Sequence, residues 1–212
     1  MANGRFITFE GADGSGKSTQ AALLADGLRK SGIDAVLTRE PGGAPGAEEI
    51  RTLLVEGGIE RWSAMAEVLL HYAARVEHMA HTIRPALEQG KWVVSDRFAD
   101  STMAYQGYGH QLGRQAVERV HRAVIGDFAP DLTLVLDAPV EAGLKRAASR
   151  SGIEDRYERM DRDFHVRLAE GFLDIARREP DRCVIVDGTG TIEEIQQSIR
   201  RLVGERLGAD LR

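Results

Sequence analysis

Short apolar runs alternate along the chain with longer segments in which apolar residues recur every three or four positions. Runs with the length and composition of β-strands occupy residues 5–10, 34–38, 91–95, 132–136 and 182–186. Helical periodicity is found in residues 17–31, 47–56, most of 62–89, and 191–207. Pro85 lies inside the third helical segment and is expected to bend its last turns. This order of elements predicts an open, parallel, doubly wound α/β sheet.

The strand runs carry almost no polar positions. Near-continuous apolar sequence is found at residues 6–9, 93–94, 132–136 and 183–186. Such runs are typical of strands that helices cover on both faces. With 212 residues and no visible linker or repeat, the chain is expected to form one α/β domain over residues 1–212. We therefore predict a five-stranded parallel sheet with helices on both faces.

Residues 11–18 follow the first predicted strand and have the pattern G-x-x-x-x-G-K-S of a phosphate-binding P-loop. Glycines allow the backbone N–H groups to curl around a polyphosphate, next to the positive end of the following helix. Lys17 supplies a cation for the β- and γ-phosphates, and the Ser18 hydroxyl suits Mg²⁺. An accidental glycine-rich turn is the alternative, which the strand before and the helix after disfavour. The predicted ATP-binding residues are Gly11, Ala12, Asp13, Gly14, Ser15, Gly16, Lys17, Ser18 and Thr19.

Other strand ends supply charged residues to the same edge of the sheet, where ligands of such folds bind. A P-loop enzyme needs an acidic residue at a neighbouring strand end to hold hydrated Mg²⁺. Asp96 and Asp137 both have this position, and we predict Ser18 and Asp96 as the metal-binding residues. Arg97 follows Asp96 and could reach a transferring phosphoryl group. The alternative is that Asp96 and Arg97 form only a surface ion pair at the end of a strand.

Residues 145–162 are rich in positive charge. They contain Lys145, Arg146, Arg150, Arg156, Arg159 and Arg162, with Gly152 near the middle. Two helices joined by a basic segment look like a lid, which we place at about 146–158. Such a lid would close over bound nucleotide, expel water and bring an arginine to the reacting phosphates. The alternative is a solvated helical hairpin.

Charge and cysteine content narrow the range of partners. The formal net charge of −5 gives no general attraction to nucleic acid or anionic membranes. Cys183 is the only cysteine and lies in an apolar strand, so an internal disulfide is excluded. No apolar run approaches the about 20 residues of a membrane span, and the N-terminus has no signal-peptide pattern. We expect a cytoplasmic protein without membrane or nucleic-acid partners.

Several segments together resemble one known family. They are FEGADGSGKST at 9–19, TREPGG at 38–43, YAAR at 72–75, DRF at 96–98, STMAYQG at 101–107, PDLTLVLD at 130–137 and GLKRA at 143–147. This set is similar to bacterial thymidylate kinases, members of the P-loop nucleoside monophosphate kinases, and extends nearly end to end. The resemblance implies ATP- and Mg²⁺-dependent phosphorylation of dTMP to dTDP in deoxythymidine nucleotide synthesis. It also implies a homodimer, for which the apolar helix 64–70 could supply an interface, although core packing explains that pattern equally well.

The resemblance also implies roles for single residues in dTMP binding. Asp13 would approach the 3′-hydroxyl, and Arg97 would bridge the acceptor phosphate and the γ-phosphoryl group. Arg75 would hold the thymine edge with Thr102 nearby, and Tyr105 would crowd the 2′ position. The remaining residues of the implied acceptor pocket are Glu40, Pro41, His71, Ser101 and Gln106.

Two features distinguish this chain within the family. Residues 12–15 contain no arginine or lysine, so the chain is similar to the type whose catalytic arginine comes from the lid; we expect Arg150 or Arg156, beside Lys17 and Arg97. His71 stands where many members have a phenylalanine that stacks on thymine. We hypothesise that His71 stacks instead and that low pH weakens dTMP binding; in the alternative, Tyr72 or a neighbour stacks.

The implied chemistry needs no general base. A phosphate monoester with a second pKa of about 6 is mostly dianionic at neutral pH and already nucleophilic. Another nucleoside monophosphate kinase is one alternative. A deoxynucleoside kinase is a second, and it would need a carboxylate base such as Glu10. A nucleotide-binding switch without catalysis is a third, and the intact Lys17, Ser18 and Asp96 argue against it.

Overall fold

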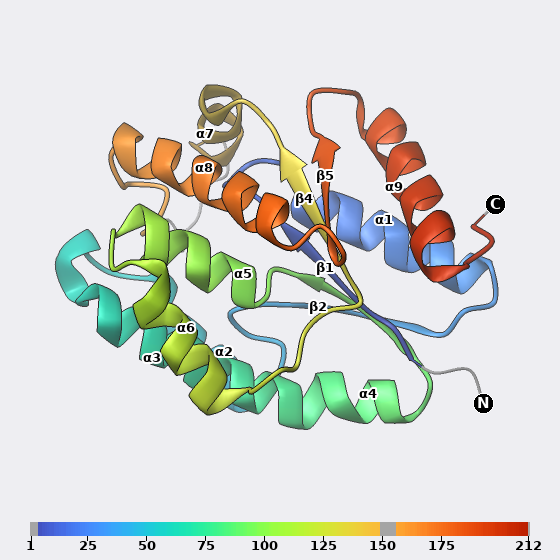
Figure 1. The fold of residues 1–212 in the computed structure, drawn as a ribbon, viewed down its shortest axis with the longest axis horizontal. Helices are drawn as coiled ribbons and strands as arrows, with labels where there is room; N and C mark the ends of the chain where they lie inside the picture. The colour runs from blue at the N-terminus through green and yellow to red at the C-terminus, as the bar shows by residue number, and fades with distance from the viewer. Residues whose placement is uncertain (1–3, 149–155, 212) are drawn as a thin grey trace.

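A five-stranded, all-parallel sheet forms the centre of the protein. The computed structural model describes residues 4–148 and 156–211 (Figure 1). The strands are β1 (Phe6–Glu10), β2 (Ala35–Arg39), β3 (Trp92–Asp96), β4 (Leu132–Asp137) and β5 (Cys183–Asp187). Their order in the sheet is β2-β3-β1-β4-β5, and every pairing is parallel. The predicted fold class is confirmed, and the strand boundaries differ from those predicted by one residue.

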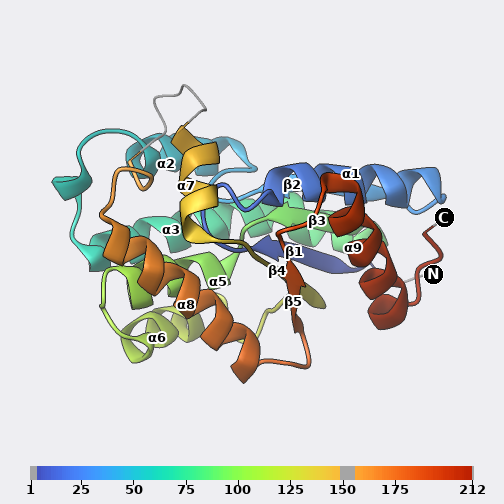
Figure 2. The same cartoon turned by 90° about the horizontal axis from the view of Figure 1, so that it is seen from above.

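Helices cover both faces of this sheet (Figure 2). On one face lie α1 (Lys17–Lys30) and α9 (Ile192–Leu207), whose apolar side chains pack on Ile7 and Phe9. On the other face, Phe6 packs in a second core with residues of the helices α3 (Ala64–His78), α4 (Arg84–Glu88), α5 (Ala99–Thr102), α6 (Arg114–Val124) and α8 (Arg162–Arg178). Successive residues of β1 therefore serve opposite cores, which explains why apolar residues fill both faces of this strand at Phe6, Ile7 and Phe9.

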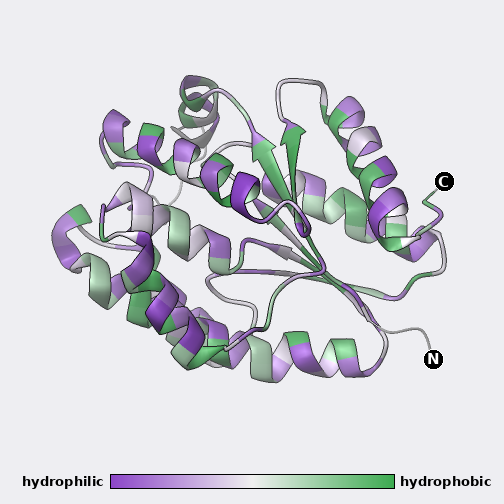
Figure 3. Ribbon diagram, viewed as in Figure 1, coloured by the Kyte–Doolittle hydropathy of each residue, from purple (hydrophilic) through white to green (hydrophobic). Residues whose placement is uncertain are grey.

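The edge strand β5 is apolar in sequence, but helices do not cover it fully on both faces. Ile185 is 41% exposed although its neighbours in sequence are apolar. Colouring by hydropathy shows the apolar strands enclosed between helices whose outer surfaces are mixed (Figure 3). A fully apolar run therefore did not distinguish the central strands from this edge strand.

The long helical segment predicted at 62–89 consists of three pieces. α3 begins after Ser63, whose side chain accepts a hydrogen bond from the Ala66 N–H. It continues as the π-helical turn η2 (Met79–Ile83) and ends in α4. Pro85 lies in the first turn of α4, where its missing N–H costs least. The change of helical geometry comes directly before Pro85, as its ring and missing donor require.

Several helices were not anticipated from the sequence. After β3 the chain forms α5, the π-helical η3 (Met103–Gly109) and α6. The short 3₁₀ turn η1 (Ile59–Arg61) and α7 (Val140–Ala148) complete the helical segments, and α2 (Pro45–Val55) is the helix predicted at 47–56, beginning two residues earlier. Among the described residues, no helix has the length and apolarity needed to span a bilayer.

Candidate active site

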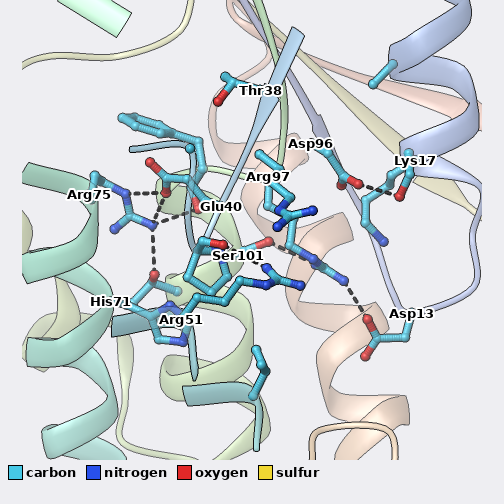
Figure 4. A pocket seen from close by; sticks show the side chains of 18 of the residues that line it. Asp13, Lys17, Thr38, Glu40, Arg51, His71, Arg75, Asp96, Arg97 and Ser101 are labelled. Carbon is cyan, nitrogen blue, oxygen red and sulfur yellow. Dashed lines mark hydrogen bonds and ion pairs between the residues drawn. The ribbon is translucent and has the colours of Figure 1, made fainter. Parts of the chain in front are cut away.

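One pocket at the carboxyl ends of the strands collects most of the predicted site (Figure 4). From the P-loop and the following helix it is lined by Asp13, Gly14, Gly16, Lys17 and Ser18. From the other strand ends and α3 it is lined by Glu40, Pro41, His71, Arg75, Asp96, Arg97, Ser101, Thr102 and Tyr105. Phosphate-binding and acceptor-binding candidates thus share one cavity.

The P-loop has the backbone that its glycines permit. Gly11, Gly14 and Gly16 have φ values of 135°, 71° and 97°, a region that side chains disfavour. Lys17 folds back over the loop, and its Nζ donates to the Ala12 carbonyl at 2.7 Å and to Ser15 Oγ at 3.3 Å. Burial lowers the pKa of Lys17 to about 8, and the charge of Arg97 acts in the same direction. A bound phosphate would give this buried ammonium a counter-ion.

The P-loop is in direct backbone contact with α7. A Cβ built on Gly14 would lie 2.0 Å from the Gly143 carbonyl oxygen, and one on Gly143 would lie 2.5 Å from the Asp13 carbonyl oxygen. Neither position has room for a side chain. The helix that leads into the predicted lid segment therefore rests on the phosphate-binding loop itself.

Ser18 and Asp96 meet where a metal ion is expected. Ser18 Oγ donates a hydrogen bond to Asp96 Oδ2, while Asp96 Oδ1 is buried and has no hydrogen-bond partner within residues 4–148 and 156–211. In that part of the chain, no three His, Cys, Asp or Glu side chains form a metal-binding group. Mg²⁺ is commonly held by one or two protein oxygens together with phosphates and water, so this pair fits Mg²⁺. Asp137, the other candidate, is exposed at the end of β4.

Arg97 connects the P-loop to the helical segment after β3. It has a φ of 74°, an uncommon value for a residue other than glycine. Its guanidinium donates to Asp13 Oδ1 at 2.6 Å, Ser101 Oγ at 3.0 Å and the Tyr105 hydroxyl at 2.9 Å. Tyr105 in turn donates to Asp13 Oδ2 at 2.7 Å. Burial alone would raise the pKa of Asp13, but the charges of Arg97 and Lys17 outweigh it and hold the pKa below its ordinary value.

Arg75 lies at the opposite wall of the pocket and is almost fully buried. Its Nε donates to Glu40 Oε2 at 2.8 Å, and its Nη2 donates to the Phe98 carbonyl and to Thr102 Oγ1, both at 3.0 Å. The buried Nη1 has no hydrogen-bond acceptor in the described part of the chain. Arg75 also lines the pocket, so its guanidinium forms part of the wall that a ligand would meet.

Of the two aromatic candidates for base stacking, only His71 lines the pocket. Its Nε2 lies 3.2 Å from the Tyr157 hydroxyl. Burial, aided by the charge of Arg75, lowers the pKa of His71 to about 4. Tyr72 is packed in the core, with its hydroxyl 3.0 Å from His121 Nδ1.

Gln106, implied for the acceptor pocket, and Glu10, the candidate base of a deoxynucleoside kinase, both have partners within the protein. Gln106 is buried, and its Nε2 donates to Glu67 Oε2 at 2.8 Å. Glu10 accepts hydrogen bonds from the Phe98 N–H at 2.7 Å and from Ser101 Oγ. Burial raises the pKa of Glu10 to about 8, and the charge of Asp100 adds to the effect. Both oxygens of this carboxylate are occupied and Glu10 does not line the pocket, which disfavours it as a base.

The two lid arginines are placed differently. Arg150 lies outside the described residues, and so does much of the predicted lid segment. Arg156 is completely buried, forms an ion pair with Glu67, and does not line the pocket. The structure therefore does not bring Arg156 to the P-loop.

Sequence reasoning missed Arg51, which lines the pocket from α2 and donates to the Pro41 carbonyl at 2.7 Å. Its guanidinium lies between those of Arg75 and Arg97 in the view of Figure 4. The only available signal was its place in the helix that follows the loop after β2.

Comparisons with known proteins agree with this geometry. A family model described as thymidylate kinase matches residues 9–199. The thymidylate kinase of Caulobacter vibrioides is 50% identical over 208 residues, which is 98% of this chain and 100% of the relative. That of Ruegeria pomeroyi is 51% identical over 200 residues, 94% of each chain. The crystal structure of thymidylate kinase from Ehrlichia chaffeensis superposes with a TM-score of 0.76 at 35% identity, covering 95% of this chain and 99% of that one. A P-loop pocket in a parallel sheet and full-length similarity lead to one conclusion: this enzyme belongs to the thymidylate kinase family of phosphotransferases.

Proposed function

We propose that the protein transfers the γ-phosphoryl group of ATP to dTMP and so forms dTDP for deoxythymidine nucleotide synthesis. The observation that carries this proposal is that one pocket is lined both by the P-loop and by Arg75. One end of it suits a polyphosphate, and the other suits a flat base with a carbonyl edge.

On the donor side, the P-loop N–H groups and Lys17 would hold the ATP phosphates. Ser18 and Asp96 would hold Mg²⁺, which would supply positive charge at the β- and γ-phosphates when bound. The Ser18 hydroxyl and the orphaned Asp96 Oδ1 support this assignment. Thr19, in the first turn of α1, is the last of the predicted ATP-binding residues.

On the acceptor side, Arg75 would donate to a thymine carbonyl, and His71 would lie against the ring. Tyr105 would exclude a 2′-hydroxyl, and its partner Asp13 would reach the 3′-hydroxyl. Arg51 lines the same pocket as Arg97 and would contribute a second cation for the acceptor phosphate. The acceptor pocket is then formed by β2, α2, α3 and the segment after β3.

Catalysis would rest on alignment and charge neutralisation, because the acceptor dianion is itself nucleophilic. Lys17 and Arg97 would neutralise the two polyanions, and Arg150 is the expected lid cation. The occupied oxygens of Glu10 argue against a hydroxyl acceptor that needs a base. A cytoplasmic location is part of the proposal and agrees with the single, buried thiol of Cys183.

A coupled assay with ATP and Mg²⁺ tests the substrate assignment. We expect turnover with dTMP, weaker turnover with dUMP, and little with dCMP, AMP or thymidine. Faster turnover of thymidine than of dTMP would identify a deoxynucleoside kinase. Tight ATP binding with no turnover of any monophosphate would identify a nucleotide-binding switch.

The buried environment of His71 predicts how dTMP binding depends on pH. With a pKa of about 4, His71 is neutral from pH 5.5 to 8, so its charge does not change in that range. We expect the ratio of KM for dTMP between His71→Phe and the unaltered enzyme to stay constant there. Titration of the substrate phosphate affects both enzymes equally and cancels in the ratio. A ratio that falls several-fold between pH 7 and 5.5 would show that His71 becomes charged in the pocket and weakens binding, as the sequence hypothesis requires.

A homodimer is a further part of the proposal, and α3 offers the surface. Leu69 and Val76 are 55% and 41% exposed, and Ala73 lies exposed between them on the same side of the helix. Their spacing of four and three residues is that of helices that pair with a second copy. We expect Leu69→Glu to convert a dimer into a monomer in sedimentation velocity. Ile192→Glu replaces a similarly exposed residue on α9 and should leave the dimer intact; dissociation by both variants, or by neither, would contradict an interface at α3.

A further inference from the structure

Arg156 donates hydrogen bonds from all three nitrogen atoms of its side chain. Its Nε donates to the Gly58 carbonyl at 2.9 Å, and its Nη2 donates to that of Ile59 at the same distance. Its Nη1 donates to the Leu54 carbonyl at 3.2 Å. These three carbonyls belong to the end of α2 and to the turn before α3. Arg156 therefore supplies donors to backbone carbonyls where α2 ends and the following turn begins; of these, the Gly58 carbonyl also accepts from the Arg61 N–H at 3.1 Å.

The charge of Arg156 is matched by Glu67 of α3, and both side chains are 0% exposed. Glu67 also accepts hydrogen bonds from Gln106 Nε2 at 2.8 Å and from the Tyr157 hydroxyl at 3.0 Å. Burial alone would raise the pKa of Glu67, but hydrogen bonds from His110, Arg156 and Gln106 lower it to about 2. The carboxylate is thus ionised, and its cation is Arg156.

This pairing restricts what Arg156 can do. Reaching the P-loop would require Arg156 to leave a fully buried carboxylate without its counter-ion and to give up its hydrogen bonds to three carbonyls. Buried charges that lose their partner are strongly destabilised. Gln106, Tyr157 and His110, whose Nε2 lies 3.3 Å from Glu67 Oε2, would remain at Glu67, but Arg156 is the only one of these partners with a permanent charge.

The residues that follow Arg156 form part of the acceptor pocket. Tyr157 and Glu158 both line it. The Tyr157 hydroxyl lies 3.2 Å from His71 Nε2, and its ring packs edge-on against Tyr105 with centroids 5.2 Å apart. The position of Arg156 therefore sets the position of an aromatic wall beside the two residues assigned to the base and the sugar.

We propose that Arg156 is a positioning residue of the acceptor pocket, which through its buried pair with Glu67 holds Tyr157 and Glu158 in place, and that it is not the cation that meets the transferring phosphoryl group. This deepens the proposed function and rests on dTMP being the acceptor. It also gives the two lid arginines of the sequence prediction different roles, because Arg156 is committed elsewhere.

The test compares Arg156→Lys and Arg156→Gln with Tyr157→Phe. For both Arg156 variants we expect KM for dTMP to rise about tenfold or more. We expect kcat at saturating dTMP and KM for ATP to stay within about threefold. This combination indicates the loss of binding energy that the ground state and the transition state share. Tyr157→Phe removes only the hydroxyl, which donates to Glu67, and should raise KM for dTMP and lower Tm by less than either Arg156 variant. Arg162→Gln breaks an exposed ion pair with Glu141 and serves as the matched control, with KM and Tm unchanged.

A double-mutant cycle measures the pair independently of catalysis. We expect Arg156→Gln and Glu67→Gln each to lower Tm, and the double variant to lower it by clearly less than the sum. Additive Tm changes would overturn the pairing. A kcat loss of about 10³-fold in Arg156→Lys, with unchanged KM for dTMP and unchanged Tm, would show an arginine acting on the transition state and would overturn the proposal. Absence of any dTMP turnover in the unaltered enzyme would refute the proposed function, whereas the Tm cycle would still test the pair.

Discussion

Replacing Arg97 with alanine is expected to lower kcat by about 10³-fold or more, with a much smaller change in KM for ATP. Arg97 lies between the two halves of the pocket and reaches Asp13, Ser101 and Tyr105 with one guanidinium. Its φ of 74° fixes the side chain over the P-loop at a cost in backbone strain. Such a residue is preorganised for charge that develops between donor and acceptor, and its removal leaves that charge without compensation.

The measurement is steady-state and single-turnover kinetics with saturating dTMP and ATP. Arg97→Gly is a second variant, because glycine accepts the positive φ and separates the loss of the guanidinium from any effect of strain. Arg5→Ala removes an exposed arginine paired with Asp131 and should retain full activity. A rate for both Arg97 variants within tenfold of the unaltered enzyme would exclude Arg97 from the chemistry.

Replacing Arg75 with alanine is expected to have the second largest effect, on acceptor binding and on stability together. Arg75 would no longer donate to a thymine carbonyl, so KM for dTMP should rise by about 10²-fold or more. Glu40 would lose its main counter-ion while 4% exposed, which typically costs about 3–5 kcal/mol. Burial alone would raise the pKa of Glu40, but Arg75 and His78 lower it overall. The stabilisation that Glu40 contributes is thus present above pH 4.5 and lost as the pH falls through its lowered pKa.

Urea unfolding and titration of dTMP measure the two effects separately. Arg75→Ala combined with Glu40→Gln removes the buried charge that is left behind and should recover part of the stability but none of the dTMP affinity. If dTMP binds Arg75→Ala as tightly as the unaltered enzyme, the base is held elsewhere in the pocket. If the single variant is as stable as the unaltered enzyme, the Glu40 carboxylate does not depend on Arg75.

The strands were the most predictable part of the fold, because β1, β3 and β4 are short, mostly apolar runs bounded by turn residues. The helical segment after β3 was not predicted. Its residues Ser101, Thr102, Tyr105 and Gln106 were noticed only for their family resemblance, since a buried helix with polar residues toward a ligand has no regular amphipathic period. Its π-helical part further departs from the spacing that sequence patterns detect.

The site was predictable where short motifs carry it and unpredictable where distant residues meet. The P-loop and Asp96-Arg97 follow strands, and their chemistry can be inferred from adjacent residues. Arg156 shares its basic segment with five other lysines and arginines, and nothing local marks it as the partner of Glu67. That pairing depends on the packing of the chain near Arg156 against α2 and α3, which only the structure shows.

Because Gly14 and Gly143 are in direct contact, the sequences of the P-loop and of the start of α7 constrain each other. Neither glycine can change alone, because a methyl group on either would overlap backbone atoms of the other segment. The consensus pattern of the P-loop leaves Gly14 as a free position, yet here it is constrained by a residue in another helix. A P-loop transplanted from a different kinase would therefore fit this protein only if its fourth residue is glycine, whatever its affinity for ATP.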